Sequence, residues 1–514
     1  MASSHDNLFW RRTAPGVWQR GVDEVEAFYS TMALLYEGSG RMFFGITGFL
    51  SFAAEAPKDM TPAVAERQMD EALAKAWIKL RYDHPTLASQ VTLDRETQQW
   101  VKTYREFGSE GDQNDWLEKT LVPISNGQTG LQWANSDPPA PLLPTLFVVR
   151  PPIATAEKSR IRRDLVFRSP HDVIDGIGTL IMLNNFINHV SKAYDQGSAF
   201  KPPVLDGSES ANLSPTYRVA ANILPALTEA QKAQMAAILA QKTELKEDTE
   251  VEVLSVPFRH GAVIPGCHKR AALTLSKGQT LRLLRACKVA GATPTHVFHT
   301  AAAMVTRDIQ PTPNEAKRVR YVSYILRNER ANCSEPYSTT KHPVAVYHSV
   351  SGQSIVVDMD LLPAGEQQDS HARKEDFLSI VSRMKAFYHG VRDDDDHGAL
   401  APSLWALGTP RLPPVAQSPP LPVPPPNPSP SVSISSMGRV DSIVARTSGS
   451  IRVYDAWVTG EELGNGLGLF LGTFDEELSL SAAYNDAWHT EEEVTDFLQR
   501  CTTTAFEGLD VSLP

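Results

Sequence analysis

The sequence predicts an α/β fold of the α+β kind, because strand-like and helix-like segments alternate along both halves of the chain. Residues 201–215 are rich in Pro, Gly, Ser and Asn, which is typical of a linker or a crossing loop between the halves. The chain has 514 residues, 42% of them hydrophobic and 21% charged. This ordinary globular composition excludes a disordered chain, a collagen repeat and a coiled-coil rod. The length alone predicts about three folding units.

The first half is expected to begin with a strand over residues 41–52 and a helix opened by Thr61 and Pro62. Thr is a favoured N-cap residue, and Pro is tolerated in the first turn because its missing N–H has no helical partner there. Apolar residues then recur at helical spacing until the chain reaches His84 and Pro85. The further elements expected in this half are strands at 145–150 and 164–168, a loop at 169–176 and a helix at 177–197.

The second half carries its own helix starts and strands. Ser276 to Gln279 and Thr490 to Glu493 have the capping-box pattern, and Thr293 with Pro294 opens a further helix. The other elements expected here are a helix over 377–391 and strands over 320–326, 345–357, 431–438, 467–473 and 478–484.

A proline-rich stretch interrupts this half at residues 410–430, where about half of the residues are proline. Such a stretch holds neither a helix nor a strand ladder, so it predicts an extended surface insertion. A role as a ligand of a proline-recognition domain stays open as the alternative.

Charge and cysteine usage narrow the class of protein. The chain has 49 basic and 60 acidic residues, which gives a formal charge of −11. This acidic balance excludes a general binder of the nucleic-acid backbone, but it allows a local basic patch at the opening of a site for a small anionic cofactor. The four cysteines are scattered without a CxxC pair, as expected of reduced thiols in the cytoplasm. The N-terminus lacks the pattern of a signal peptide, and the longest apolar run is too short to span a bilayer. We therefore expect a cytoplasmic protein with no membrane and no nucleic-acid partner.

The most informative segment is the loop that carries His171, Asp175 and Gly176. A His at the end of a strand, followed four residues later by an Asp that opens a helix, is a setting in which neighbours fix the tautomer and pKa of the ring. The pattern arises by chance in roughly one protein of this size in twenty-five, so loop capping by His171 remains an alternative. A metal site of His171, Asp172 and Asp175 is also conceivable but lacks further ligands at metal spacing. Asp172 is expected to face solvent or to cap the loop, and Gly176 with Gly178 does not complete a dinucleotide loop.

Several segments, in order, resemble the CoA-dependent acyltransferase superfamily, which includes chloramphenicol acetyltransferase, the plant BAHD transferases and the condensation domains of peptide synthetases. The matching segments are 80–87, the His171-x-x-x-Asp175-Gly176 motif, 291–304 and 435–438. The resemblance covers about residues 17 to 505 and is greatest to the fungal trichothecene 15-O-acetyltransferases, from segments 18–20, 36–44 and 484–489. The BAHD Asp-Phe-Gly-Trp-Gly signature is missing. Pro170 stands where condensation domains have a first His.

This resemblance implies a fold of two chloramphenicol-acetyltransferase-like lobes, each a mixed sheet flanked by helices, with an active-site tunnel between them. The implied boundaries are an N-terminal lobe at 1–200, a crossover at 201–250 and a C-terminal lobe at 251–514 that includes the insertion at 410–430.

The resemblance also implies the chemistry. Acetyl-CoA is the implied co-substrate, and no permanently bound cofactor and no metal are implied. The implied acceptor is a trichothecene-like sesquiterpenoid alcohol of fungal secondary metabolism. The resemblance also implies that the enzyme is a monomer. His171 is the implied general base, and no acyl-enzyme is required. Asp175 is implied to be structural and to pair with Arg327 or Arg330. The residues implied to contact the substrate or the oxyanion are Gly176, Ser435, Ser436 and Gly438, with Ser433 as a further candidate.

Two other functions stay open. One is a condensation-type enzyme that takes acyl groups from carrier-protein thioesters, although no carrier domain is present in this chain. The other is a non-catalytic binding protein that keeps the fold, which the intact His171 and Asp175 argue against.

Overall fold

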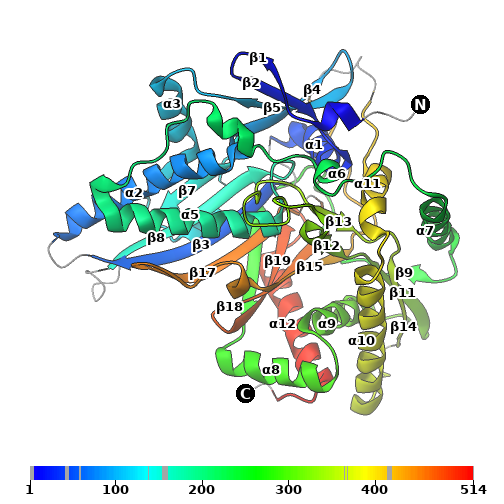
Figure 1. The fold of residues 1–514 in the computed structure, drawn as a ribbon. Helices are drawn as coiled ribbons and strands as arrows, with labels where there is room; N and C mark the ends of the chain where they lie inside the picture. The colour runs from blue at the N-terminus through cyan, green and yellow to red at the C-terminus, as the bar shows by residue number, and fades with distance from the viewer. Residues whose placement is uncertain are drawn as a thin grey trace.

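A six-stranded mixed sheet forms the N-terminal lobe of the computed structural model, which describes residues 5–40, 45–56, 60–136, 138–152, 160–363, 365–366, 368–413, 420–462 and 464–512. The strands lie in the order β16-β17-β3-β8-β7-β6, and helices α2 and α5 pack along this sheet (Figure 1). The bounds are β3 (Gly45–Glu55), β6 (Leu121–Ile124), β7 (Thr145–Val149), β8 (Arg160–Pro170), β16 (Thr447–Ser448), β17 (Ile451–Gly460), α2 (Pro62–Asp83) and α5 (Gly176–Gln196).

A second, antiparallel sheet in the N-terminal lobe has the order β1-β2-β5-β4, and α1 follows β2 directly. The bounds are β1 (Arg11–Ala14), β2 (Val17–Gly21), β4 (Ser89–Asp94), β5 (Gln99–Arg105), α1 (Glu24–Tyr36), α3 (Glu110–Thr120) and α4 (Gly130–Ala134).

The C-terminal lobe has a four-stranded sheet in the order β10-β19-β18-β15, with α8, α9 and α12 gathered beside it (Figure 1). Two smaller sheets, β14-β11-β9 and β12-β13, complete the lobe. The strand bounds are β9 (Glu252–Val253), β10 (His268–Thr274), β11 (Lys317–Ser323), β12 (Leu326–Asn328), β13 (His348–Val350), β14 (Ile355–Leu361), β15 (Val432–Arg439), β18 (Leu467–Phe474) and β19 (Glu477–Asn485). The helix bounds are α6 (Tyr217–Ala220), α7 (Glu229–Glu247), α8 (Lys277–Val289), α9 (Pro294–Asp308), α10 (Ser370–Arg392), α11 (His397–Gly408) and α12 (Glu491–Gly508).

Strand β17 joins the two lobes, because it belongs to the C-terminal part of the sequence but pairs with β3 in the N-terminal sheet. The pairing runs from Ile451 opposite Ala54 to Gly460 opposite Ile46. The chain then returns to the C-terminal lobe through β18. Part of the range 251–514 therefore lies within the N-terminal sheet.

Each lobe has its own hydrophobic core. The core of the N-terminal lobe packs α2 and α5 on β3 and β8, around residues such as Trp77 and Phe186. The core of the C-terminal lobe packs α9 and α12 on β15, β18 and β19, around residues such as Phe298 and Phe497. Two separate apolar cores of this size are typical of two folding units, and the predicted α+β fold with two lobes is confirmed.

The predicted helix starts agree well with the structure. Both predicted capping boxes are present, and α9 begins at Pro294 after Thr293. Helix α2 begins at Pro62 as predicted, but the Thr61 hydroxyl makes no capping hydrogen bond, so only its backbone carbonyl serves the first turn. The segments predicted as single strands at 320–326 and 345–357 are each divided into two short strands.

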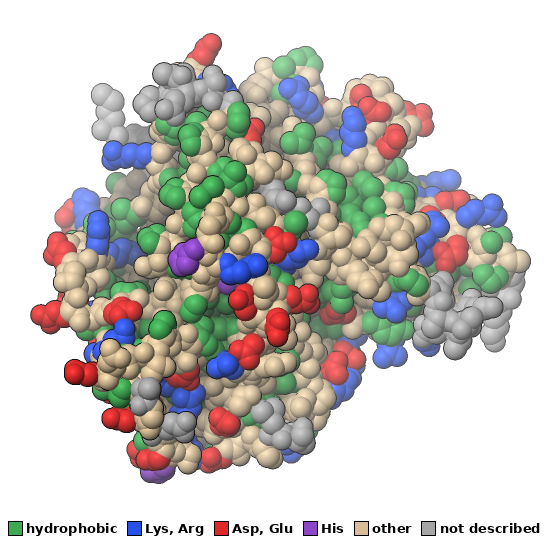
Figure 2. Space-filling model, turned by 180° about the vertical axis from the view of Figure 1, so that it is seen from behind, with side chains coloured by type: hydrophobic (Ala, Val, Ile, Leu, Met, Phe, Trp, Pro, Cys, Tyr) green, Lys and Arg blue, Asp and Glu red, His purple; other side chains and the backbone are tan. Residues whose placement is uncertain are grey.

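One face of the molecule is mixed in charge (Figure 2). On the face seen in Figure 2, Lys and Arg side chains lie among Asp and Glu side chains, so the net negative charge is dispersed there. Of the proline-rich stretch, residues 414–419 lie outside the described residues, and the described remainder contains neither helix nor strand. None of the helices in the described ranges has the length and apolarity needed to cross a membrane.

Candidate active site

The motif loop, residues 171–175, connects the end of β8 at Pro170 to the start of α5 at Gly176. Asp175 is the N-cap of α5, and its side chain accepts a hydrogen bond from the Gly178 backbone N–H at 2.7 Å. The short polar side chain thus satisfies one of the donors that a helix start leaves open. His171 lies at the other end of the loop, directly after the strand.

Asp175 also forms a buried ion pair with Arg330, which belongs to the C-terminal half of the sequence. Arg330 Nη1 lies 2.9 Å from Asp175 Oδ2, and the same oxygen accepts the Tyr347 N–H at 2.7 Å. Burial acts to raise the pKa of Asp175, but the charge of Arg330, the effect of His348 and the hydrogen bonds from Arg330 and the Gly178 N–H outweigh it and lower the pKa below its usual value. Arg327, the other predicted partner, instead donates to the carbonyl of Val391 at 3.2 Å.

Gly178 allows the Arg330 side chain to approach the first turn of α5. A Cβ atom at this position would lie 2.2 Å from the carbonyl oxygen of Pro343 and 2.7 Å from Arg330 Nη2. Arg330 Nη2 itself contacts the carbonyls of Pro343 and Ala345 at 3.3 and 3.4 Å. The glycine is therefore needed for close packing between α5 and the segment that precedes β13.

His171 lies beside aromatic neighbours and lines the cavity described below. Its ring stacks on the ring of Tyr29, with centroids 3.9 Å apart and an interplanar angle of 8°. The imidazole of His348 lies 5.6 Å away, centroid to centroid. Nδ1 of His171 is buried, so Nε2 is the ring nitrogen that faces the cavity.

The surroundings of His171 favour the neutral imidazole. Burial lowers the pKa to about 3, with a further contribution from His348, against the opposing effect of the Asp175 charge and of nearby backbone groups. The ring is therefore unprotonated at neutral pH and able to accept a proton.

Three residues beside His171 were missed by the sequence analysis: Tyr29, His348 and Trp405. The Tyr29 hydroxyl lies 2.9 Å from His348 Nε2, and the His348 and Trp405 rings meet edge to face at 5.3 Å. They come from α1, β13 and α11, and no spacing in the sequence relates them to the motif.

A cavity of about 650 Å³ opens beside His171 and is lined by both lobes. Of the predicted site residues, it is lined by His171, Asp175, Gly176, Arg327, Arg330, Ser433, Ser435 and Ser436. Gly438 is not part of this lining. Gly438 is exposed and has a φ of +64°. It lies directly after the point where the pairing of β15 with β18 shifts in register, beyond Ser436.

The serines on β15 reach the cavity because of strand alternation. Val432 and Ile434 are buried in the core of the C-terminal lobe, so Ser433 and Ser435 point to the opposite face. Ser436, the last residue before the register shift of β15, accepts a hydrogen bond from the Thr295 hydroxyl on α9 at 2.9 Å.

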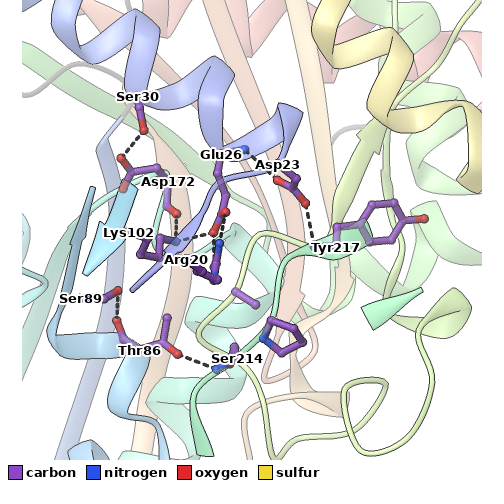
Figure 3. A network of polar contacts seen from close by, with 12 residues as sticks. Arg20, Asp23, Glu26, Ser30, Thr86, Ser89, Lys102, Asp172, Ser214 and Tyr217 are labelled. Atoms are coloured by element: carbon purple, nitrogen blue, oxygen red, sulfur yellow. Dashed lines mark hydrogen bonds and ion pairs between the residues drawn. The ribbon is translucent and has the colours of Figure 1, made fainter. Parts of the chain in front are cut away.

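A network of buried charges supports the motif loop from the side of helix α1 and the β1-β2-β5-β4 sheet (Figure 3). Lys102 Nζ donates to the carbonyl of Asp172 at 2.7 Å and forms an ion pair with Glu26. Glu26 also binds Arg20 through two hydrogen bonds of 2.7 and 2.8 Å. The Ser30 hydroxyl donates to Asp172 Oδ2 at 2.7 Å. Asp172 is buried, so the expectation that it faces solvent is wrong, because α1 and β5 cover it with polar partners.

In the described parts of the chain, no three His, Cys, Asp or Glu side chains come together in a way that would hold a metal ion.

Comparisons with known proteins agree with the fold and identify acetyltransferases among the similar proteins. No protein-family model matches the chain. It is 23% identical to the acetyltransferase pigO of Monascus ruber, over 93% of this chain and 94% of the relative. It is also 23% identical to the O-acetyltransferase pigM of the same organism, over 77% of this chain and 68% of the relative.

Solved structures resemble the chain over nearly its whole length. The trichothecene 15-O-acetyltransferase of Fusarium sporotrichioides superposes with a TM-score of 0.76 at 17% identity, covering 98% of this chain and 99% of that protein. The first condensation domain of the calcium-dependent antibiotic synthetase superposes with a TM-score of 0.58 at 14% identity, covering 96% and 97%. The chain therefore shares the two-lobed fold of these solved structures, and its sequence is similar to those of two fungal acetyltransferases.

Proposed function

We propose that the chain transfers an acetyl group from acetyl-CoA to a hydroxyl group of a fungal secondary metabolite, a trichothecene-like sesquiterpenoid alcohol. The observation that carries this proposal is the position of His171, whose Nε2 faces a cavity between the two lobes while its ring is neutral. Transfer to an alcohol needs a base at such a place, close to both substrates and shielded from water.

The proposed reaction has a single addition intermediate. Nε2 of His171 takes the proton of the acceptor hydroxyl as that oxygen attacks the thioester carbonyl. The tetrahedral intermediate then collapses, the carbon–sulfur bond breaks, and the imidazolium returns its proton to the departing thiolate. Free CoA and the acetyl ester are the products, and His171 is neutral again.

The negative charge on the carbonyl oxygen needs a donor from the protein. The Ser435 hydroxyl fits this role, because the side chain points from β15 into the cavity that His171 also lines. Asp175 has a different role. Its carboxylate binds Arg330 and the start of α5, so it fixes the loop and does not take a proton from the substrate.

The lining of the cavity fits a bulky acceptor that carries both apolar and polar groups. Aromatic and aliphatic side chains line it together with a similar number of polar and charged side chains. The apolar side chains among the lining residues include Phe28, Trp405, Leu404, Met437 and Phe470. The structural similarity to a trichothecene 15-O-acetyltransferase supports the same class of acceptor.

We place this activity in the cytoplasm and in a single copy of the chain. Cys287, Cys333 and Cys501 are buried thiols, which fits a reducing compartment.

The proposal is tested by following thiol release from acetyl-CoA with a panel of terpenoid alcohols. We expect wild-type turnover with at least one alcohol and a loss of about 10²–10⁴-fold in kcat for His171→Ala, the usual contribution of a general base. The matched control is His371→Ala, which removes a surface imidazole on α10. Full turnover by His171→Ala would show that the ring is not the base.

The same assay also tests the two alternative functions, a condensation-type enzyme and a non-catalytic binding protein. Thiol release only from acyl groups bound to a carrier protein would favour a condensation-type enzyme. Binding of alcohols without any turnover would favour a non-catalytic protein.

A further inference from the structure

Tyr29 and His348 form a connected unit with His171 and Asp175 that spans the two lobes. Tyr29 is on α1, His348 is on β13, and both are buried, with 6% and 9% of their surface exposed. The Tyr29 ring covers one whole face of the His171 ring, nearly parallel to it. The Tyr29 hydroxyl in turn lies at hydrogen-bond distance from His348 Nε2.

The charge of Asp175 decides which way this hydrogen bond runs. His348 Nδ1 is buried, and it lies 4.0 Å from Asp175 Oδ2. A carboxylate stabilises the tautomer that carries its proton on the facing nitrogen. His348 then has its proton on Nδ1, and Nε2 accepts the proton of the Tyr29 hydroxyl. The position of Tyr29 is thereby fixed by a group on the other lobe.

We infer that Tyr29, anchored by His348, is a positioning residue that holds the ring of His171 in its working orientation and keeps water from one of its faces. The inference rests on the proposed role of His171 as the base. Neither Tyr29 nor His348 exchanges a proton with the substrate in this scheme. Their effect is exerted through the His171 ring, one face of which the Tyr29 ring covers.

The groups that face His171 come from three elements. They are Tyr29 on α1, His348 on β13, and Asp175 at the start of α5, whose partner Arg330 lies in the segment between β12 and β13. His348 is a neutral neighbour at neutral pH, because burial lowers its pKa despite the opposing charge of Asp175. Loss of the Tyr29 ring exposes His171 to water, and this change raises the pKa of His171 from its present low value toward 6.5.

The first experiment compares Tyr29→Leu with Tyr29→Phe in the thiol-release assay. For Tyr29→Leu, we expect kcat to fall by about 10–100-fold with KM values changed by less than about threefold, as is usual when a catalytic group is misplaced. The acid limb of the kcat/KM profile should move upward by about one pH unit or more. Tyr29→Phe keeps the ring, so the acid limb should stay in place while kcat falls by only about threefold to tenfold. Tyr194→Phe, a buried tyrosine at the far end of α5, is the matched control.

The second experiment is a double-mutant cycle between the hydroxyl and the imidazole. If the Tyr29 hydroxyl acts through His348, then Tyr29→Phe and His348→Leu remove the same hydrogen bond. The double variant should then have the kcat of the slower single variant, within about twofold. His348→Gln, whose amide oxygen can accept the same proton, should recover most of the loss.

The outcomes separate this inference from the proposed function. If His171→Ala is inactive but Tyr29→Leu keeps the wild-type kcat and pH profile, the positioning role is wrong and the base assignment stands. If the two single losses multiply in the double variant, the anchoring by His348 is wrong. If Tyr29→Leu does not fold, Tyr29→Phe and the cycle still decide the matter. If His171→Ala is active, the proposed function itself fails.

Discussion

The guanidinium of Arg330 lies 2.9 Å from the carboxylate of Asp175, although 155 residues separate them in the sequence. This ion pair is buried and joins the end of the motif loop to the segment that precedes β13. Its partners on the Asp175 side are backbone N–H groups of Gly178 and Tyr347. The orientation of the loop that carries His171 therefore depends on a residue of the other half of the chain.

Asp175→Asn should strongly destabilise the protein, because it leaves the Arg330 charge buried without a counter-charge. The expected loss is about 3–5 kcal/mol in the free energy of unfolding, measured by urea denaturation. The exposed pair of Arg318 and Asp360 is the control, and Asp360→Asn should cost less than about 1 kcal/mol. A loss as small as that of the control would contradict the role given to the buried pair.

The contribution of Asp175 should also depend on pH. Its pKa is lowered in the folded protein from the usual 3.8, so its ionised form stabilises the folded state above that value. This contribution is lost as the pH falls through the lower folded-state pKa. The difference in stability between wild type and Asp175→Asn should therefore be constant from pH 8 to 5 and shrink only at more acidic pH. A difference that shrinks between pH 8 and 5 would point to another group.

Gly178→Ala should destabilise the protein and slow the reaction, since the new methyl group meets the Pro343 carbonyl and displaces Arg330. The expected cost is about 1–3 kcal/mol, the usual range for overpacking. Gly176→Ala, two residues earlier, is the control for stability, because its Cβ would lie 3.5 Å from Val458 and 3.7 Å from Met437, in ordinary contact. Thermal unfolding of both variants measures the difference, and equal melting temperatures would be the contrary result.

Ser435→Ala should lower kcat by about 10²-fold or more if its hydroxyl stabilises the oxyanion, with little change in the KM for acetyl-CoA. Ser436→Ala is the comparison. We expect it to lower kcat by less than Ser435→Ala, because the Ser436 hydroxyl already accepts a hydrogen bond from Thr295. Steady-state kinetics on both variants checks this, and a larger loss for Ser436→Ala would move the oxyanion role to that residue.

Lys102→Met should weaken the support of the motif loop. The ammonium group is fully buried between Glu26 and the Asp172 carbonyl, so among the described residues its loss leaves Glu26 with Arg20 alone as a counter-charge. We expect a loss of about 3–5 kcal/mol in the free energy of unfolding, together with a lower kcat. Lys79→Met removes a partly exposed lysine that pairs with Asp83 on α2 and should cost less than about 1 kcal/mol. A similar loss for both variants would argue against a special role for the buried lysine.

Local signals in the sequence predicted much of this molecule. The sequence predicts the capping boxes at Ser276 and Thr490, the start of α2 at Pro62 and the α+β class. These features could be predicted because they depend on residues within one or two helical turns. The motif loop was readable for the same reason, since His171, Asp175 and Gly176 lie within six residues. The resemblance to the acyltransferase superfamily added the two-lobed arrangement.

Tertiary structure alone decided which residues meet. The sequence left Arg327 and Arg330 as equal partners for Asp175, and packing of β12 and the segment after it brings only Arg330 within reach. It gave no sign that β17 pairs with β3, that Asp172 is buried on Lys102, or that Tyr29 lies on His171. Each of these contacts joins segments tens to hundreds of residues apart, and each depends on the sum of many weak contacts in two cores. The sequence by itself therefore determined the elements and the reactive group, whereas the packing of the lobes decided how that group is held.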